Sequence, residues 1–256
     1  SHPTDAQGKP AAPGGQGKTR QHDKVTRMGT ESIPRLITEF AIPSILGMLV
    51  NGAYNVIDSI FLGQAMGEIG LSTATVAMPV MTVFMAIAML VGNGGNALAA
   101  LRMGEGKPEE AERSLGNTVT LSLVASVVVA IVMFVPACID GLLSVSGATP
   151  EDWDYAMQFI RIISLGFIFQ CIGMGVNNFI RTAGAPNRAL GTMIIGAVAC
   201  TAFNALFVLV MGMGVVGSAL ATVCGQAISC ATVLWYFCLT KGVPMRLRLR
   251  MMPLHG

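Results

Sequence analysis

Long apolar stretches with few or no charged residues alternate with short polar segments along most of the chain. A helix needs about 20 apolar residues to cross ~30 Å of hydrocarbon, and these stretches are about that long or longer. They cover residues 36–63, 69–101, 114–139, 162–180 (beginning earlier, near Tyr155) and 189–240. The last stretch is about twice one bilayer thickness at ~1.5 Å rise per residue, so we predict that it folds back at the glycine-rich segment 212–217. The pattern therefore predicts an all-α membrane protein, a bundle of six transmembrane helices.

The basic residues predict how these spans are oriented. Six spans place both ends of the chain on one side of the membrane. In this arrangement, the basic residues of the N-terminal tail, of the loops after spans two and four, and of the C-terminal tail share that side. The loops on the opposite side contain Glu68 and the acidic turn 151–154. Because cytoplasmic loops are enriched in Lys and Arg, we expect both termini to be cytoplasmic and the protein to lie in the cytoplasmic (inner) membrane of the cell.

The polar segments at the two ends complete the predicted domain organisation. Residues 1–29 are polar and rich in Gly, Pro, Gln and Lys, which predicts a disordered cytoplasmic tail rather than a signal peptide. Residues 30–240 form the six-helix transmembrane lobe. Residues 241–256 are predicted to be a basic cytoplasmic segment and the beginning of a linker to more protein, on the membrane surface and in contact with lipid headgroups.

Composition agrees with a membrane protein and argues against several other classes. The chain is 53% hydrophobic and 12% charged, with a mean hydropathy of +0.64, whereas a soluble domain has about 25% charged residues. The net charge of +2 indicates no nucleic-acid partner. The six cysteines lie in apolar stretches without C-x-x-C spacing, and all three histidines lie near the chain ends, so we expect no metal site. Because paired catalytic groups and hydrolase motifs are missing from the spans, we do not expect an enzyme or a bound organic cofactor.

Polar residues inside the first span are the strongest functional signal. Asn51, Asn55 and Asp58 are spaced i, i+4, i+7, which places them on one helical face. Ionisable groups at membrane depth are costly and usually functional. This stripe therefore predicts a cavity-facing site, and the alternative is a structural hydrogen-bonded clasp between helices. Further neutral polar residues lie in other spans, including Asn177, Asn178 and Asn204.

Several segments, in the order in which they occur, resemble the multidrug and toxic compound extrusion (MATE) family, and its DinF-like prokaryotic branch in particular. They are Pro43 with Asn51-Gly-Ala-Tyr-Asn-Val-Ile-Asp58, Ala74-Thr-Val-Ala-Met-Pro79, Gly104-Glu-Gly-Lys107, Asn177-Asn-Phe-Ile-Arg181 with Gly184-Ala-Pro186, and Gly214-Val-Val-Gly217. The matches extend from about residue 33 to 250 and correspond to the N-terminal six-helix lobe of a two-lobe transporter.

The resemblance implies a cation-coupled antiporter that exports cationic or amphipathic, drug-like small molecules. It assigns cation coupling to Asp58, and the cavity residues to Asn51, Tyr54, Asn55, Asn177, Asn178 and Asn204. The expected partners are membrane lipids and a second six-helix lobe, in the same chain or in a second copy. We expect helix bending near Pro43 or Gly47 to follow protonation of Asp58.

The sequence departs from the family pattern on the fifth helix, where many relatives carry Asn and, four residues later, Asp. Here these positions are Cys200 and Asn204. Asp58 is therefore the main acid of the lobe, and a single carboxylate favours H⁺ over Na⁺ as the coupling ion. Two alternatives remain: a lipid-linked oligosaccharide flippase of the same superfamily, and a non-transporting membrane scaffold or inactive half.

Overall fold

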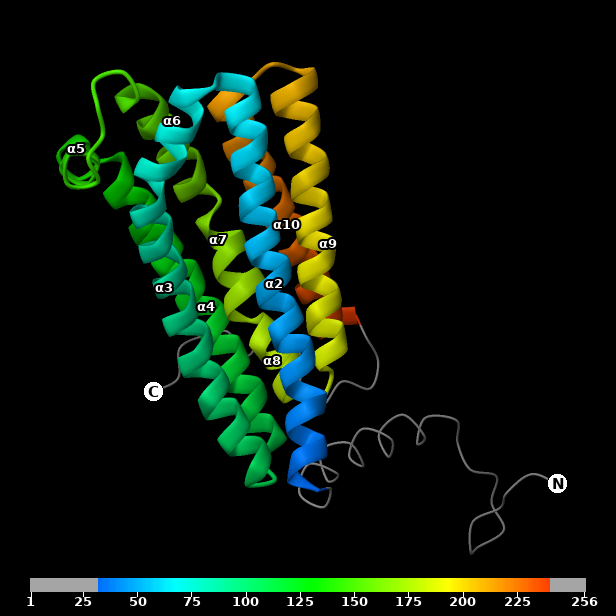
Figure 1. Ribbon diagram of the computed structural model, residues 1–256. Coiled ribbons are helices and arrows are strands. Elements are labelled where there is room, and N and C mark those ends of the chain that lie inside the picture. Colours follow the sequence, from blue (N-terminus) through cyan, green and yellow to red (C-terminus); the bar gives the residue numbers. More distant parts are fainter. Residues whose placement is uncertain (1–31, 240–256) are drawn as a thin grey trace, which may run out of the picture.

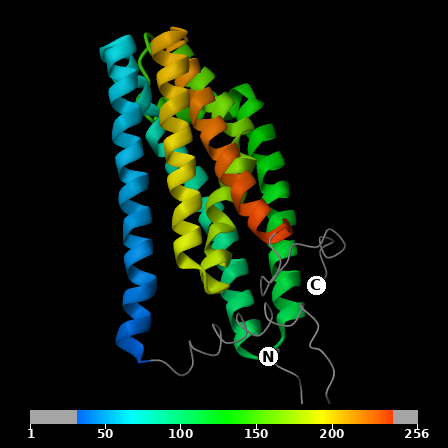
Figure 2. The same ribbon diagram turned by 90° about the vertical axis from the view of Figure 1, so that its right-hand side faces the viewer.

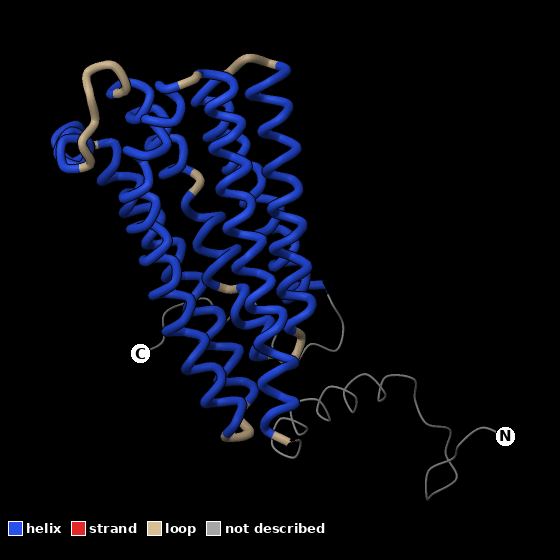
Figure 3. Tube along the Cα trace, in the orientation of Figure 1, coloured by secondary structure: helices blue, strands red, loops and turns tan. Residues whose placement is uncertain are grey.

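The fold is a bundle of helices, described here from a computed structural model for residues 32–239 (Figure 1). Within this range no residue belongs to a strand, and the connections between helices are short (Figure 3). In chain order the elements are α2 (Ile33–Met66), α3 (Glu68–Gly104), α4 (Pro108–Phe134), α5 (Pro136–Val145), α6 (Trp153–Leu165), α7 (Phe167–Gln170), η1 (Cys171–Gly175), α8 (Asn177–Thr182), α9 (Pro186–Asn204), η2 (Ala205–Val210) and α10 (Gly214–Leu239). The predicted tail 1–29 and the predicted basic segment 241–256 lie outside the described residues.

Five of the predicted spans are long apolar helices. They are α2, α3, α4, α9 continued by η2, and α10. The fourth span is broken. Helix α6 and the segment Phe167–Thr182 are long and apolar enough to cross a membrane only when they are taken together, and the pair is bent by 55°. With that pair counted as one span, the described residues contain the six membrane-crossing segments that the sequence predicts, so the predicted fold class is confirmed.

The structure corrects the bounds of the third span. We expected one helix over residues 114–139, but α4 begins at Pro108 and ends at Phe134. Pro136 then starts the separate helix α5, which is seen nearly end-on beside the bundle at the upper left of Figure 1. Proline favours the first turn of a helix because it has no N–H to donate and its φ is already helical. The charge-free pattern did not reveal this boundary because residues on both sides of Pro136 are apolar.

The turns gather at two ends of the bundle, which we name after glycines in them. The Gly67 end contains the α2–α3 turn and the connection from η2 to α10, and the Gly106 end contains the α3–α4 and α8–α9 turns (Figure 1). Gly67 and Gly106 have φ values of 60° and 75°, a backbone conformation that other residues rarely adopt. These glycines allow the chain to reverse between long helices with very few loop residues.

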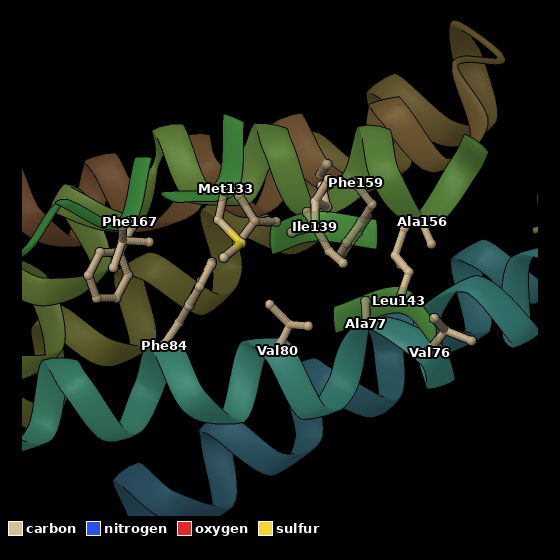
Figure 4. Packing of buried hydrophobic residues seen from close by; sticks show 14 of the residues in the cluster. Val76, Ala77, Val80, Phe84, Met133, Ile139, Leu143, Ala156, Phe159 and Phe167 are labelled. Atoms are coloured by element: carbon tan, nitrogen blue, oxygen red, sulfur yellow. The ribbon is translucent and has the colours of Figure 1, made fainter. Parts of the chain in front are cut away.

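The core consists of two buried clusters, one between α3, α4, α5 and α6 near the Gly67 end, and the other mainly between α4, α8 and α10. Figure 4 shows Val80 and Phe84 of α3 facing Met133 of α4 and Phe167 of α7, and the rings of Phe84 and Phe167 are 5.2 Å apart. Large apolar residues also cover the outside of the bundle, for example Leu90 at 75% and Val198 at 64% exposure. An apolar exterior is expected where helices contact lipid rather than water.

The helices that carry the predicted site pack side by side. Figure 2 shows α2 next to α9, with α10 beside α9. A Cβ on Gly225 of α10 would lie 2.6 Å from the Cβ of Cys200 on α9. Small residues at helix crossings let backbones approach closely in membranes, where apolar burial gives little driving force. The close approach brings the polar residues of α2, α9 and α10 within hydrogen-bonding distance.

Candidate functional site

Asp58 lies inside the lobe, where α2 meets α9 and α10. The Nδ2 of Asn204 donates a short hydrogen bond to the Oδ1 of Asp58, and the Oγ of Ser218 donates to the same oxygen at 2.9 Å. Asn204 is 1% and Ser218 0% exposed, whereas Asp58 is half-buried. Residues 146 and 160 positions away in the sequence thus enclose one carboxylate, and we call Asp58, Asn204 and Ser218 the carboxylate triad.

The carboxylate triad holds one unused acceptor. The Oδ1 of Asn204 is buried and has no hydrogen-bond partner within residues 32–239. A buried amide oxygen without a partner costs free energy, so such a group in a native protein calls for a functional explanation. It lies on the residue that also donates to Asp58. The Nδ2 of Asn204 faces Asp58, so its Oδ1 would face a proton or a small cation bound there only after the amide rotates.

Tyr54 and Cys200 complete the surroundings of the triad. Tyr54 is half-buried one helical turn before Asp58 and lies within electrostatic range of both Asp58 and Cys200. Cys200 is 4% exposed, and its thiol contacts Thr222 of α10. Both neighbours are only weakly polar. Among the described residues that surround the triad, Asp58 is the one carboxylate.

Sequence reasoning missed the part of the site that α10 supplies. Ser218 and Thr222 are one turn apart on α10, and both are buried. The hydroxyl of Thr222 also donates to the backbone oxygen of Ser218 at 3.0 Å. A serine and a threonine at i, i+4 in an apolar span were the available signal, but such hydroxyls usually bond their own helix.

The structure separates the three polar residues that the first span was predicted to present on one face. Asn55 is exposed, and its amide donates to the backbone oxygen of Asn51 at 2.8 Å within α2. Asn55 lines an open groove of about 460 Å³ between α2 and α3, together with Ser59 and Met78. Asp58 points instead towards α9 and α10. Asn55 and Asp58 of the predicted stripe therefore face different places, a surface groove and the interior of the lobe, and Asn51 is half-buried one turn before Asn55.

The two asparagines of the fourth span hold helices together at the Gly106 end. Asn177 is 3% exposed and donates to the Oγ1 of Thr192 at 2.6 Å and to the backbone oxygen of Ala189 at 3.2 Å. Asn178 is half-buried and donates to the Oδ1 of Asn93 on α3 at 2.6 Å. These contacts hold α8 against α9 and α3. The cavity role of Asn177 and Asn178 stays a prediction.

Pro43 and Gly47 are buried where α2 faces α9. The helix continues through both residues, from Ile33 to Met66. A Cβ on Gly47 would lie 2.9 Å from the sulfur of Met193 on α9. The break that the structure does show lies in the fourth span at Gly166, followed by the π-helical turn η1. The predicted bending at Pro43 or Gly47 stays a prediction.

A second cavity opens at the Gly67 end and is more enclosed than the α2–α3 groove. It has a volume of about 540 Å³ and lies between α2, α6 and the η2–α10 connection. Its walls include Gln64, Met66, Tyr155 and Gln158, and Val208 and Val215 also line it. We call it the end vestibule. Within residues 32–239, no three His, Cys, Asp or Glu side chains lie close enough to hold a metal ion.

Comparison with known families shows which family this chain belongs to. The family model MatE matches residues 43–206, which extend from the first predicted span into the fifth and include two members of the carboxylate triad. The chain belongs to this family. The sequence resemblance to MATE proteins is therefore confirmed over more than half of the chain.

The matched MATE relatives are named as export and resistance proteins rather than as enzymes. The multidrug export protein MepA of Staphylococcus haemolyticus is 24% identical over 210 residues, which cover 80% of this chain and 45% of that protein. The probable multidrug resistance protein YoeA of Bacillus subtilis is 23% identical over 214 residues and has the same two coverages, 80% and 45%. The chain thus spans about half the length of the curated relatives it matches.

Solved transporter structures share the fold at similar coverage. The MATE multidrug transporter DinF-BH superposes with a TM-score of 0.79 at 37% identity, over 85% of this chain and 49% of that one. A MOP superfamily transporter from Pyrococcus furiosus gives a TM-score of 0.78 at 27% identity, over 86% of this chain and 48% of that one. The described bundle therefore corresponds to one lobe of these larger MATE proteins, and the predicted DinF-like resemblance is confirmed. This chain is a multi-pass membrane protein of a transporter family.

Proposed function

We propose that this lobe is half of a cation-coupled antiporter that exports cationic or amphipathic small molecules, with H⁺ rather than Na⁺ as the coupling ion. One observation carries the proposal: the carboxylate of Asp58 is held between Asn204 and Ser218 inside an apolar bundle. Desolvating a carboxylate at membrane depth is costly. Its retention is explained if the acid binds and releases the coupling ion.

The oxygen donors around Asp58 support a proton better than a sodium ion. The triad offers one carboxylate, one amide oxygen and one hydroxyl, and the family position that often holds a second acid is Asn204 here. Hard cations prefer several oxygen ligands and more negative charge than this. A protonated Asp58 needs one hydrogen-bond acceptor. The unpaired Oδ1 of Asn204 can accept that hydrogen bond after a rotation of the amide.

Protonation changes how α2 is held against α9 and α10. The charged carboxylate accepts hydrogen bonds from Asn204 and Ser218, and both weaken once the charge is lost. In our proposal this release lets α2 shift or bend near Pro43 or Gly47. The α2–α3 groove that Asn55 lines then changes shape, and a bound compound is expelled. A transition between two packed arrangements of this kind is typical of switching proteins.

The described charges support an orientation with the Gly106 end in the cytoplasm of the cell and the protein in its cytoplasmic membrane. Basic residues gather at that end, including Arg102, Lys107 and Arg188, whereas Glu151 lies just before α6 and Asp154 lies in its first turn, at the Gly67 end. In this orientation both chain termini are cytoplasmic. A second six-helix lobe, in the same polypeptide or in another copy, would close the α2–α3 groove.

The test is Asp58→Asn in a protein that contains both lobes, reconstituted in liposomes with ethidium, a planar aromatic cation, as the cargo. We expect loss of export driven by a pH gradient, while ethidium binding in the absence of a gradient persists. Asp154→Asn, which changes an exposed carboxylate next to the bundle, is the matched control and should keep export. Unchanged gradient-driven export in Asp58→Asn would eliminate the proposed role.

A further inference from the structure

The end vestibule lies directly above the carboxylate triad along three helices. On α2, Leu62 follows Asp58 by one turn, and Met66 of the vestibule wall follows Leu62 by another. Where α9 continues into η2, Val208 follows Asn204 by one turn. Each of these positions repeats at i, i+4, which keeps them on one side of a helix. The vestibule and the triad are therefore stacked, with one layer of side chains between them.

The layer between them is apolar and closed. On α10, Val215 precedes Ser218 by three residues, which is again about one turn. Val208 and Val215 line the vestibule and are nevertheless only 2% and 1% exposed, so they form its floor. Leu62 is 1% exposed and belongs to the same buried cluster as Val215. We call Leu62, Val208 and Val215 the apolar floor.

We propose that the end vestibule is the entry site for the coupling cation on its way to Asp58, and that the apolar floor is its gate. This inference rests on the proposed role of Asp58. It assigns functions to residues that the coupling mechanism above does not use: the polar wall of Gln64, Tyr155 and Gln158, and the two valines of the floor.

The chemistry of the two parts fits an entry and a gate. Amide and phenol groups on the vestibule wall offer hydrogen bonds to water and to a hydrated cation. An apolar constriction a few ångströms across excludes water and ions until it widens, because no group in it replaces their hydration. When closed, the floor separates the water of the vestibule from Asp58.

The backbone next to Val208 gives the floor a means of opening. Val208 lies in η2, a π-helical turn that begins immediately after Asn204. Such turns are frequently found at functional sites and hold their backbone less regularly than an α-helix. A change in the Asn204–Asp58 hydrogen bond therefore acts at the residue immediately before the segment that carries Val208. The gate and the ion site are linked through one short stretch of chain.

A native thiol beneath the floor reports whether it is open. Cys200 lies one turn before Asn204 and is 4% exposed. We would replace the other five cysteines by Ala and embed the protein in sealed vesicles. Modification of Cys200 by the charged thiol reagent MTSET, added on one side at a time, would then be followed by mass spectrometry. The five are Cys138, Cys171, Cys224, Cys230 and Cys238.

We expect slow modification in the Cys200-only parent and a rate about tenfold higher in Val208→Ala/Val215→Ala, from the side of the Gly67 end only. Val215→Ala alone should give an intermediate rate and serves if the double variant does not fold. Val198→Ala is the matched control: it removes the same atoms from a position on the outside of α9 that is 64% exposed, and should match the parent.

Equal rates in the parent and in the floor variants, or equal rates from both sides of the membrane, would overturn the proposal. That failure is distinct from a failure of the proposed function. If Asp58→Asn abolishes gradient-driven export while the floor variants leave Cys200 labelling unchanged, the coupling role stands and the entry route is wrong. If labelling rises but Asp58→Asn keeps export, the vestibule opens onto a site that does not couple, and the entry role is wrong as well.

Discussion

Gly92 of α3 and Gly175 of η1 cross so closely that a Cβ on Gly92 would lie 2.3 Å from the Cα of Gly175. Gly175 in turn faces Ala88, whose backbone oxygen would lie 2.9 Å from a Cβ added at Gly175. Both glycines are buried, at the place where the broken fourth span passes α3. The absence of side chains on both helices is what allows the π-helical turn to pack there.

Gly92→Ala is therefore expected to destabilise the lobe by about 1–3 kcal/mol, because the added methyl group meets backbone that cannot rotate away. The measurement is thermal unfolding in detergent, with a fall in the midpoint temperature. Gly94→Ala is the matched control, since nothing lies within 4 Å of a Cβ at Gly94. There the change should be neutral or slightly stabilising, because alanine favours the helix. Equal midpoints for the two variants would contradict the close crossing.

Asp152 ties α3 to the turn before α6 and makes stability depend on pH. The residue is 1% exposed, and its carboxylate accepts hydrogen bonds from the Ser72 hydroxyl and from the Thr149 backbone N–H and hydroxyl, the last two at 2.6 and 2.9 Å. Burial by itself raises the pKa of Asp152, but the hydrogen bonds from Ser72 and Thr149 outweigh it and hold the pKa below its usual value. Because the folded-state pKa is the lower one, the stabilisation is present above the unfolded pKa of about 3.9 and is lost as the pH falls through the folded value.

We expect Asp152→Asn to lower stability by about 1–3 kcal/mol at neutral pH, since buried donors lose a charged acceptor. The difference between the wild type and this variant should shrink as the pH is lowered below about 4. Thermal unfolding at several pH values measures both effects. Asp154→Asn, two residues further on and exposed, should show a smaller and flatter difference. If the difference in stability between the wild type and Asp152→Asn stays constant with pH, the stabilising role of the ionised Asp152 is contradicted.

Variants of Asn177 and Asn178 test whether these residues hold helices together or line the transport cavity. Asn177→Ala removes a buried donor to Thr192 and Ala189 and should cost about 1–3 kcal/mol of stability. Asn178→Ala breaks one bond to the exposed Asn93 and should cost less than about 1 kcal/mol. Unfolding of the two variants side by side measures this order. Loss of export in Asn177→Ala with full stability would instead assign that residue to the transport path.

Asn204→Asp tests why the triad favours a proton. It adds a second carboxylate next to Asp58 while keeping the size of the side chain. Two acids and the Ser218 hydroxyl form a better oxygen site for a hard cation. We therefore expect stabilisation by NaCl over choline chloride to appear in the variant, measured as a rise in the unfolding midpoint. The control is Asn204→Leu, which should show no sodium dependence. A sodium effect of equal size in the wild type would argue against the preference for H⁺.

Much of the architecture follows from the sequence because membrane insertion is a local property of the chain. An uninterrupted apolar stretch such as residues 69–101 must be helical in lipid, where each backbone N–H and C=O needs a partner within its own segment. The six crossings and the fold-back near Gly212 were predictable on this ground. The separate helix α5 was not, since residues 136–145 are as apolar as the span before them and composition does not reveal that the helix ends at Phe134. The bend at Gly166 was also missed, because a glycine in an apolar run does not reveal whether the chain breaks there.

The sequence by itself determined that Asp58 is a carboxylic acid in a lipid-spanning helix, because span length and charge can be read along the chain. Only the tertiary structure decided that Asp58 faces Asn204 and Ser218, while Asn55 turns to the groove beside α3. Helical spacing fixes the angle between side chains on one helix, but not which neighbouring helix each of them meets. That choice depends on how closely α2, α9 and α10 pack, which is set by contacts between residues far apart in the sequence, such as Gly225 and Cys200.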